Sequence, residues 1–200
     1  MKTGKINFML VGVGGQGTLL ASDILADLGL RLGFDAKKAE IHGMAQRGGS
    51  VTSFVRWDEQ VFSPIIASGE VDILVAFEPL EALRYLGQLK PSGTLLVNSQ
   101  VIEPITVKAG QGIYPSPDES SKAFEKYAGK VFYIDGLQIA EEAGNGKAVN
   151  VAMLGALSAL LDTPEDTWLE AVEAHVPPKA LEANRKAFKL GREKVELENR

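Results

Sequence analysis

Cysteine is absent from the 200 residues of this sequence. The absence excludes disulfide bonds, thiolate nucleophiles, structural cysteine–zinc sites and cysteine-ligated iron–sulfur clusters on this chain. Any such centre has to be supplied by another protein.

Histidine is also scarce, and basic residues are outnumbered by acidic ones. The only histidines, His42 and His175, are far apart in the sequence, and no aspartate joins them at a metal-ligand spacing, so we expect no metal site. There are 21 lysines and arginines against 26 aspartates and glutamates, which gives a formal net charge of -5. A duplex nucleic-acid binder needs a basic face, so small molecules or proteins are the expected partners.

Long apolar runs are missing as well. No stretch approaches the roughly 18 uninterrupted apolar residues of a membrane-spanning helix, and Met1 to Lys5 contains no apolar signal core. We therefore expect a cytoplasmic protein that binds no membrane.

The apolar residues that are present, 45% of the chain, are enough for one full core, and no linker rich in proline, glycine or serine divides them. We expect a single domain over residues 1–200, with an α/β core over 1–135 and a helical extension over 136–200.

Short extended runs alternate with helical patterns along the first part of the chain. This alternation predicts an α/β, Rossmann-like fold with a mainly parallel sheet, flanking helices and a helical C-terminal segment. Val51 to Trp57 alternates apolar and polar residues and predicts a half-exposed strand, and Pro79 after Glu78 predicts a helix over Leu80 to Leu89. The other predicted strands are Ile6 to Val11, Ala36 to Ile41, Val71 to Phe77, Thr94 to Asn98 and Val131 to Ile134.

A glycine turn follows the first predicted strand and precedes a helix. Gly12, Gly14 and Gly17 have the spacing of the dinucleotide-binding fingerprint, and the free N–H groups at a helix start favour an anion. A tight turn that binds nothing is the alternative. The candidate cofactor-binding residues, for an anion, coenzyme A or a nucleotide, are Gly12, Gly14, Gly15, Gln16 and Gly17.

The residues after Glu40 form an unusual loop. In a parallel sheet the carboxyl ends of neighbouring strands lie at one edge, so we expect this loop beside the glycine turn. Glycines surround Arg47, whose guanidinium can then bind a carboxylate or phosphate; an ion pair of Arg47 with Glu40 or Glu78 is the alternative. The candidate partner- or ligand-binding residues at this edge are Glu40, His42, Met44, Gln46, Arg47, Gly48, Gly49, Ser50 and Glu78.

No catalytic constellation is recognisable. An ordinary hydrogen-bonded loop residue is a simpler interpretation of His42 than a general base, and the sequence has neither a G-x-S-x-G elbow nor a Walker lysine. The catalytic residues are therefore unknown at this point.

The C-terminal region is helical. Val149 to Leu161 is apolar on nearly every side and predicts a buried helix, and Ala152, Gly155, Ala156 and Ala159 form a thin face. Packing within the domain is the commoner reason for such a face, and contact with another chain is the alternative. Thr163 is the predicted N-cap of the next helix.

Two strings carry a family resemblance. The first is Gly12-Val13-Gly14-Gly15-Gln16-Gly17-Thr18, and the second is Glu40-Ile41-His42-Gly43-Met44-Ala45-Gln46-Arg47-Gly48-Gly49-Ser50-Val51, followed by Val55-Arg56. Together they closely resemble the beta subunits of indolepyruvate ferredoxin oxidoreductases. More broadly, the chain is similar to the gamma subunits or domains of 2-oxoacid ferredoxin oxidoreductases.

The resemblance implies a role in oxidative decarboxylation of an arylpyruvate, with coenzyme A as co-substrate and ferredoxin as electron acceptor. It also implies a larger alpha subunit that carries thiamine diphosphate and iron–sulfur clusters, which agrees with the missing cysteines. This chain would be an accessory subunit, inactive alone, with the glycine turn and Arg47 at the coenzyme A edge.

Three alternatives remain. The complex could act on pyruvate or 2-oxoglutarate instead of an arylpyruvate. The glycine spacing and Glu40 also fit a free-standing NAD(P)- or FMN-dependent oxidoreductase, or a nucleotide-sensing module without catalysis.

Overall fold

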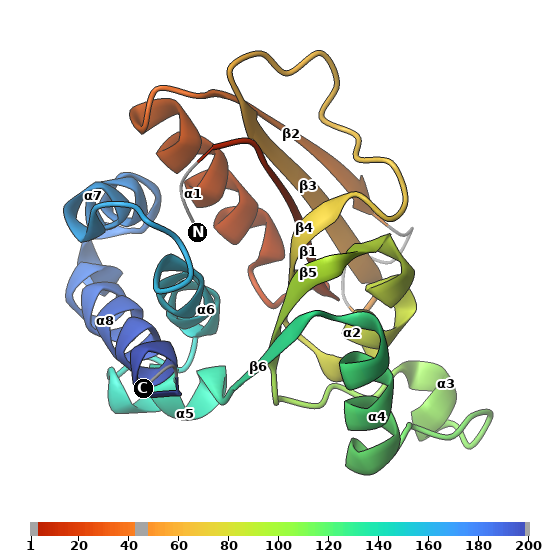
Figure 1. Ribbon diagram of the computed structural model, residues 1–200. Helices are drawn as coiled ribbons and strands as arrows, with labels where there is room; N and C mark the ends of the chain where they lie inside the picture. The colour runs from red at the N-terminus through yellow and green to blue at the C-terminus, as the bar shows by residue number, and fades with distance from the viewer. Residues whose placement is uncertain (1–3, 43–47, 199–200) are drawn as a thin grey trace.

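The computed structural model describes residues 4–42 and 48–198. Within them, six strands form one central sheet in the order β2-β3-β1-β4-β5-β6 (Figure 1). β1, β4, β5 and β6 are parallel neighbours, whereas β3 runs antiparallel to both β1 and β2. The strands are β1 (Ile6–Val13), β2 (Asp35–His42), β3 (Ser50–Asp58), β4 (Val71–Ala76), β5 (Leu89–Asn98) and β6 (Lys130–Ile134).

Helices cover both faces of the sheet (Figure 1). α1, α6, α7 and α8 cover one face, and α2 and α4 cover the other. The helices are α1 (Thr18–Arg31), α2 (Pro79–Tyr85), α3 (Ile105–Lys108), α4 (Pro117–Tyr127), α5 (Gly136–Glu142), α6 (Val149–Ser158), α7 (Glu165–His175) and α8 (Leu181–Glu198), with short 3-10 helices at Leu86–Gln88 and Pro178–Ala180. The prediction of an α/β, mainly parallel fold with a helical C-terminal segment is confirmed.

β3 differs from its prediction. It lies inside the sheet, and its residues 51–55 are buried, so the expectation of a half-exposed strand is wrong. Val55 and Trp57 pack toward α1, while Phe54 packs into the opposite hydrophobic cluster. Even its polar residues Thr52 and Ser53 are buried, which an alternating pattern cannot reveal.

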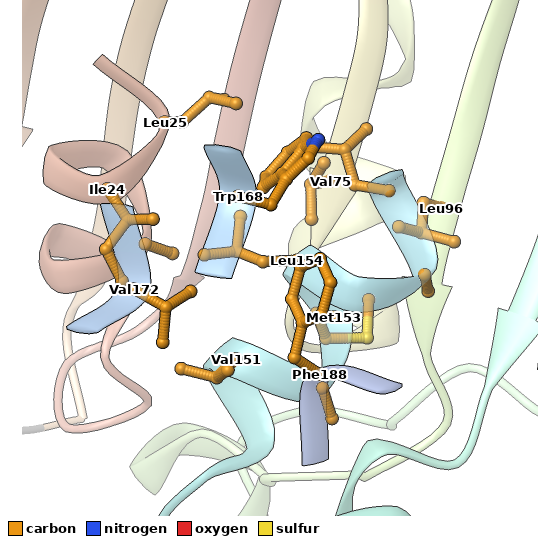
Figure 2. Close-up of a cluster of buried hydrophobic side chains, with 14 of the residues drawn as sticks. Ile24, Leu25, Val75, Leu96, Val151, Met153, Leu154, Trp168, Val172 and Phe188 are labelled. Carbon is orange, nitrogen blue, oxygen red and sulfur yellow. The ribbon is translucent and has the colours of Figure 1, made fainter. Parts of the chain in front are cut away.

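The larger core lies between the sheet and the C-terminal helices. Figure 2 shows Trp168 of α7 packed with Leu154 of α6 and Val75 of β4. The Trp168 and Phe188 ring centroids are 5.9 Å apart, which brings α7 and α8 into the same cluster. This core fixes the C-terminal helices against the sheet and thereby places one wall of the site described below.

α6 and α8 cross at very short range. A Cβ atom on Gly155 would lie 2.0 Å from the Phe188 carbonyl oxygen, and one on Gly191 would lie 2.0 Å from the Ala152 carbonyl oxygen. The small-residue face predicted on α6 therefore packs within the chain, as the commoner interpretation holds.

Two local predictions are wrong. α2 ends at Tyr85 rather than Leu89, because Leu89 already belongs to β5 and pairs with Val71. Thr163 is not a helix cap: Pro164 occupies that position, and the Thr163 hydroxyl accepts a hydrogen bond from Trp168 Nε1 at 2.7 Å.

Candidate functional site

A groove of about 860 Å³ lies where β1 ends and α1 begins. One wall consists of residues 13–17 with Leu20, and the opposite wall comes from the segments before α6 and around the start of α8. The remaining lining residues are Gly48, Gln100, Ile102, Asn145, Gly146, Lys147, Val149, Asn150, Val176, Pro177, Lys179, Ala180 and Asn184.

The glycine turn needs its glycines for different reasons. Gly15 and Gly17 have positive φ angles of 108° and 78°, a region that glycine enters without steric cost. Gly12 lies within β1, and a Cβ there would come 2.8 Å from Thr18 Oγ1 and 3.0 Å from Gln16 Oε1. Gly12 thus leaves room for the neighbouring side chains beneath the turn.

Gln16 ties the turn to the sheet. Its Oε1 accepts a hydrogen bond from Val13 N at 2.8 Å, and its Nε2 donates to the Phe77 carbonyl at 2.7 Å. The same carbonyl accepts a bond from the buried Asn98, whose Oδ1 in turn accepts one from Gly136 N at 3.0 Å. This network joins the ends of β1, β4 and β5 to the start of α5 and ties the turn to the sheet.

Gly17 also brings α1 against α6. A Cβ on Gly17 would lie 2.6 Å from Asn150 Nδ2, and that nitrogen donates to the Gly17 carbonyl at 3.3 Å. Asn150 is 4% exposed and lies in the groove wall. Gly17, the third glycine of the dinucleotide-binding spacing, therefore permits contact between two helices. In the usual fingerprint this glycine permits contact between a helix and a strand.

The groove suits an anionic ligand. The first N–H groups of α1 have no carbonyl acceptor within the helix, and together with the helix dipole they favour negative charge. Lys147 and Lys179 add positive charge from the opposite wall, and none of the described lining residues is aspartate or glutamate. A phosphate or carboxylate is the ligand group that this lining fits best.

The end of the predicted loop lies beside the glycine turn. Gly14 N donates to the Gly49 carbonyl at 2.8 Å, and Gly48 lines the groove. Ser50 begins β3, and His42 is the last residue of β2. The predictions for Met44, Gln46 and Arg47 fall outside the described residues.

Glu40 lies away from the turn. β3 separates β2 from β1, so Glu40 is not on the strand next to the glycine turn, where a dinucleotide fold places its ribose-binding acid. Its Oε1 lies 2.5 Å from Lys38 Nζ.

Glu78 is turned inward. It is 1% exposed and caps α2, where Oε2 accepts bonds from Leu80 N at 2.6 Å and Glu81 N at 3.1 Å. Its Oε1 accepts bonds from Ile102 N and the Tyr114 hydroxyl. Burial and this bond to a carboxylate raise the pKa of Tyr114 well above its ordinary value, so the phenol remains a donor.

Glu81 is a second buried carboxylate. Its Oε2 accepts a hydrogen bond from Ser50 Oγ at 2.5 Å, and its Oε1 one from Arg84 Nη1 at 2.6 Å. Burial, with a smaller contribution from the charge of Glu78, raises the pKa of Glu81. Ser50 therefore joins β3 to α2 on the face opposite α1.

The sequence prediction missed the far wall of the groove. Asn150, Lys147 and Lys179 reach the site only through the packing of α6 and α8, and no local motif marks them. The Asn145-Gly146 pair is the one local signal of a turn before α6. Among the residues described, no group of three or more histidine, cysteine, aspartate or glutamate side chains is placed to hold a metal ion.

The structure is that of a mainly parallel α/β domain with a groove at the carboxyl end of β1. The family model for pyruvate ferredoxin/flavodoxin oxidoreductases matches residues 7–194. The chain belongs to this family, as the resemblance implied.

Individual relatives of the chain are also subunits of oxidoreductases. The indolepyruvate oxidoreductase subunit IorB of Thermococcus kodakarensis is 40% identical over 92% of this chain and 93% of its own length. IorB of Archaeoglobus fulgidus is 39% identical, covering 94% of each chain. The solved gamma subunit of a keto/oxoacid ferredoxin oxidoreductase from Geobacter sulfurreducens has a TM-score of 0.71 and 26% identity, covering 96% of this chain and 99% of that one.

Proposed function

We propose that this chain is the smaller, accessory subunit of an indolepyruvate ferredoxin oxidoreductase. The complex would decarboxylate an arylpyruvate oxidatively, transfer the arylacetyl group to coenzyme A and pass the electrons to ferredoxin. The observation that carries the proposal is the 40% identity to IorB of Thermococcus kodakarensis over nearly the full length of both chains.

The redox chemistry would belong to the partner. Iron–sulfur clusters need thiolate ligands, and this sequence contains no cysteine. The family resemblance assigns thiamine diphosphate and the clusters to the larger alpha subunit, and the isolated chain would be inactive. When bound there, thiamine diphosphate supplies the electron sink for decarboxylation.

The groove would bind the phosphate groups of coenzyme A. Its glycine turn and the N-terminus of α1 provide backbone N–H groups, and Lys147 and Lys179 provide positive charge on the other side. Gln16 supports the turn through Phe77 rather than contacting the ligand with its amide. Arg47 and the neighbouring loop residues remain proposed as a further part of this edge.

The nicotinamide alternative is weaker. Glu40 lies one strand too far from the glycine turn for the ribose-binding role, and its carboxylate is paired with Lys38. Titrating the isolated chain with NAD, NADP and FMN tests this alternative. Micromolar affinity together with turnover by the isolated chain would replace our proposal.

Co-expression tests the main proposal. The tagged chain should co-purify with a brown, cluster-bearing alpha subunit, and the complex should reduce ferredoxin with indolepyruvate and coenzyme A. Turnover of pyruvate and 2-oxoglutarate in the same assay decides the substrate class. Failure to form a stable complex, with full activity of the alpha subunit alone, would overturn the proposal.

A further inference from the structure

Asn145 differs from the other asparagines in the described part of the chain. Those four have at most 6% of their surface exposed, whereas Asn145 is partly exposed. The Nδ2 of Asn145 donates to no acceptor within residues 4–42 and 48–198, so its amide nitrogen is unrestrained. Each of the four donates from Nδ2 to a backbone carbonyl: Asn7 to Glu70, Asn98 to Phe77, Asn150 to Gly17 and Asn184 to Ala180.

The side-chain carbonyl of Asn145 is held in the turn between α5 and α6. Its Oδ1 accepts a hydrogen bond from Lys147 N at 3.1 Å, and the backbone carbonyl of Asn145 accepts one from Ala148 N at 2.8 Å. A donor at Oδ1 stabilises the negative charge that develops on this oxygen when a nucleophile attacks Cγ. The turn therefore favours attack on the side-chain carbonyl carbon.

A nucleophile follows directly in the sequence. In the described residues the backbone nitrogen of Gly146 donates to no acceptor, although the nitrogens on either side of it do. Gly146 is exposed to solvent, and it has no Cβ atom to obstruct the approach of its nitrogen to Asn145 Cγ. Asn145 is also the only asparagine in the sequence that precedes a glycine.

Asn145 is part of the groove lining. Its neighbour Lys147 adds positive charge to the same wall, and no aspartate or glutamate is found among the described lining residues. Conversion of the Asn145 amide to an acid would therefore add the first carboxylate to a lining that is otherwise neutral or basic.

We propose that Asn145 is a site of spontaneous deamidation that places a carboxylate in the wall of the groove. The Gly146 nitrogen, after losing its proton to solvent, attacks Asn145 Cγ and forms a C–N bond. The bond from Cγ to Nδ2 breaks, Nδ2 takes up a proton and leaves as ammonia, and a succinimide ring remains. Water then opens the ring to aspartate or isoaspartate at position 145, so water is the only other reactant.

The effect on ligand binding rests on the proposed function, whereas the covalent step does not. A carboxylate at position 145 offsets the positive charge of Lys147 and repels the phosphate groups of coenzyme A. Deamidated molecules should therefore bind coenzyme A more weakly than newly made ones.

Mass spectrometry of the full chain tests the covalent step. The purified protein is held for days in neutral and in mildly alkaline buffer and then digested with trypsin, which releases residues 131–147 with Asn145 as their only asparagine. Fragment ions should place the mass gain of replacing NH2 by OH at position 145. The gain should form faster in alkaline buffer, because attack needs a deprotonated Gly146 nitrogen, while Asn98 and Asn150 stay intact.

Gly146→Ala is the matched control. Gly146 has no positive φ, and a Cβ there would lie 3.9 Å from Glu141 Cγ and 4.0 Å from Leu137 Cδ1, so the variant should keep the wild-type circular dichroism. The added methyl obstructs attack, and Asn145 should deamidate at least about tenfold more slowly. An intact Asn145 in aged wild type, or equal rates in the two proteins, would overturn the inference.

A charge variant tests the effect on the groove. In the complex, Asn145→Asp should raise the KM for coenzyme A about two- to fivefold with kcat nearly unchanged. Gln138→Glu makes the same change of an amide to a carboxylate at an exposed position of α5 outside the groove lining, and it should leave the KM unaltered.

The two measurements separate the two proposals. A complex whose activity does not depend on coenzyme A contradicts the proposed function, and the mass spectra then decide the modification by themselves. A coenzyme A-dependent complex in which Asn145→Asp has the wild-type KM would show that the added carboxylate does not act on the ligand, which overturns the inferred effect on the groove.

Discussion

Asn150 donates a hydrogen bond to the carbonyl of Gly17, although 133 residues separate them in the sequence. The contact joins the start of α1 to the start of α6, and both residues line the groove. It depends on the missing side chain at Gly17, where any Cβ would lie 2.6 Å from the Asn150 amide nitrogen.

Gly17→Ala should destabilise the protein. The positive φ of 78° adds about 1–2 kcal/mol for a residue with a Cβ, and the clash with Asn150 adds about 1–3 kcal/mol. Gly144→Ala is the control, because Gly144 has φ 92° and a Cβ added there would meet nothing within 4 Å. Urea denaturation should show a larger loss for Gly17→Ala, and equal losses would contradict the role of the Asn150 contact.

Gly155→Ala should be more damaging. The added methyl meets the backbone of Phe188, which can move only if α6 and α8 separate, so we expect a loss of at least about 3 kcal/mol. Gly87→Ala, with nothing within 4 Å, should stay within about 0.5 kcal/mol of wild type. Thermal unfolding measures both, and a mild effect at Gly155 would mean that the crossing is looser than described.

Asn98→Ala should destabilise the glycine turn, because Asn98 and Gln16 bind the same Phe77 carbonyl. The change leaves the buried Gly136 N–H without its acceptor, at a cost of about 1–3 kcal/mol, and removes one of two donors to the Phe77 carbonyl, which still accepts from Gln16. Asn98→Asp keeps the acceptor but not the donor. Denaturant unfolding should therefore rank wild type above both variants, and a stable Asn98→Ala protein would argue against the network.

Glu81 should give an unusual pH dependence. Because its folded pKa is raised, the folded state binds more protons than the unfolded state above about pH 4.3, and its contribution to stability falls as pH rises through the folded pKa. Glu81→Gln should remove this pH dependence of the unfolding free energy and be the more stable protein at pH 7. Unfolding free energies between about pH 4 and about pH 8 test it.

Glu119 is the control, because its pKa is shifted in the opposite direction to that of Glu81. Hydrogen bonds from Ser116 lower the pKa of Glu119, so the stability it contributes is lost as pH falls through that pKa. Identical pH profiles for Glu81→Gln and Glu119→Gln would contradict the assignment.

Lys147→Ala/Lys179→Ala should raise the KM for coenzyme A in the complex. Exposed ion pairs contribute up to about 1 kcal/mol, so an increase of about two- to fivefold for each lysine is expected, with kcat nearly unchanged. Lys194→Ala on α8, outside the groove lining, should leave the KM unaltered. An unchanged KM in the double variant would remove the lysines from the proposed site.

Local patterns predicted the parts of the site that neighbours in sequence define. The strand, glycine turn and helix follow from residues 6–28, and Pro79 after Glu78 marks the start of α2. The pairing of strands that are distant in the sequence could not be predicted from such local patterns. No periodicity indicates that β3 inserts antiparallel between β1 and β2, which moves Glu40 away from the turn.

The far wall of the groove escaped prediction for the same reason. Lys147 and Lys179 belong to surface turns with ordinary composition, and they reach the groove only because Gly155 and Gly191 let α6 and α8 pack closely. Glu78 follows β4 at the edge of the sheet where the sequence prediction placed it. Its carboxylate is buried, however, because it accepts hydrogen bonds from Leu80 N and Glu81 N.

The two walls of the groove come from residues 13–20 and 145–184, with most of the sheet between them in the sequence. During synthesis the groove therefore cannot form until residues 145–184 have left the ribosome, and products truncated before them lack it. A ligand bound there stabilises the association of the two chain ends by mass action. Protection of α8 from proteolysis would consequently report occupancy of a site that begins at the other end of the polypeptide.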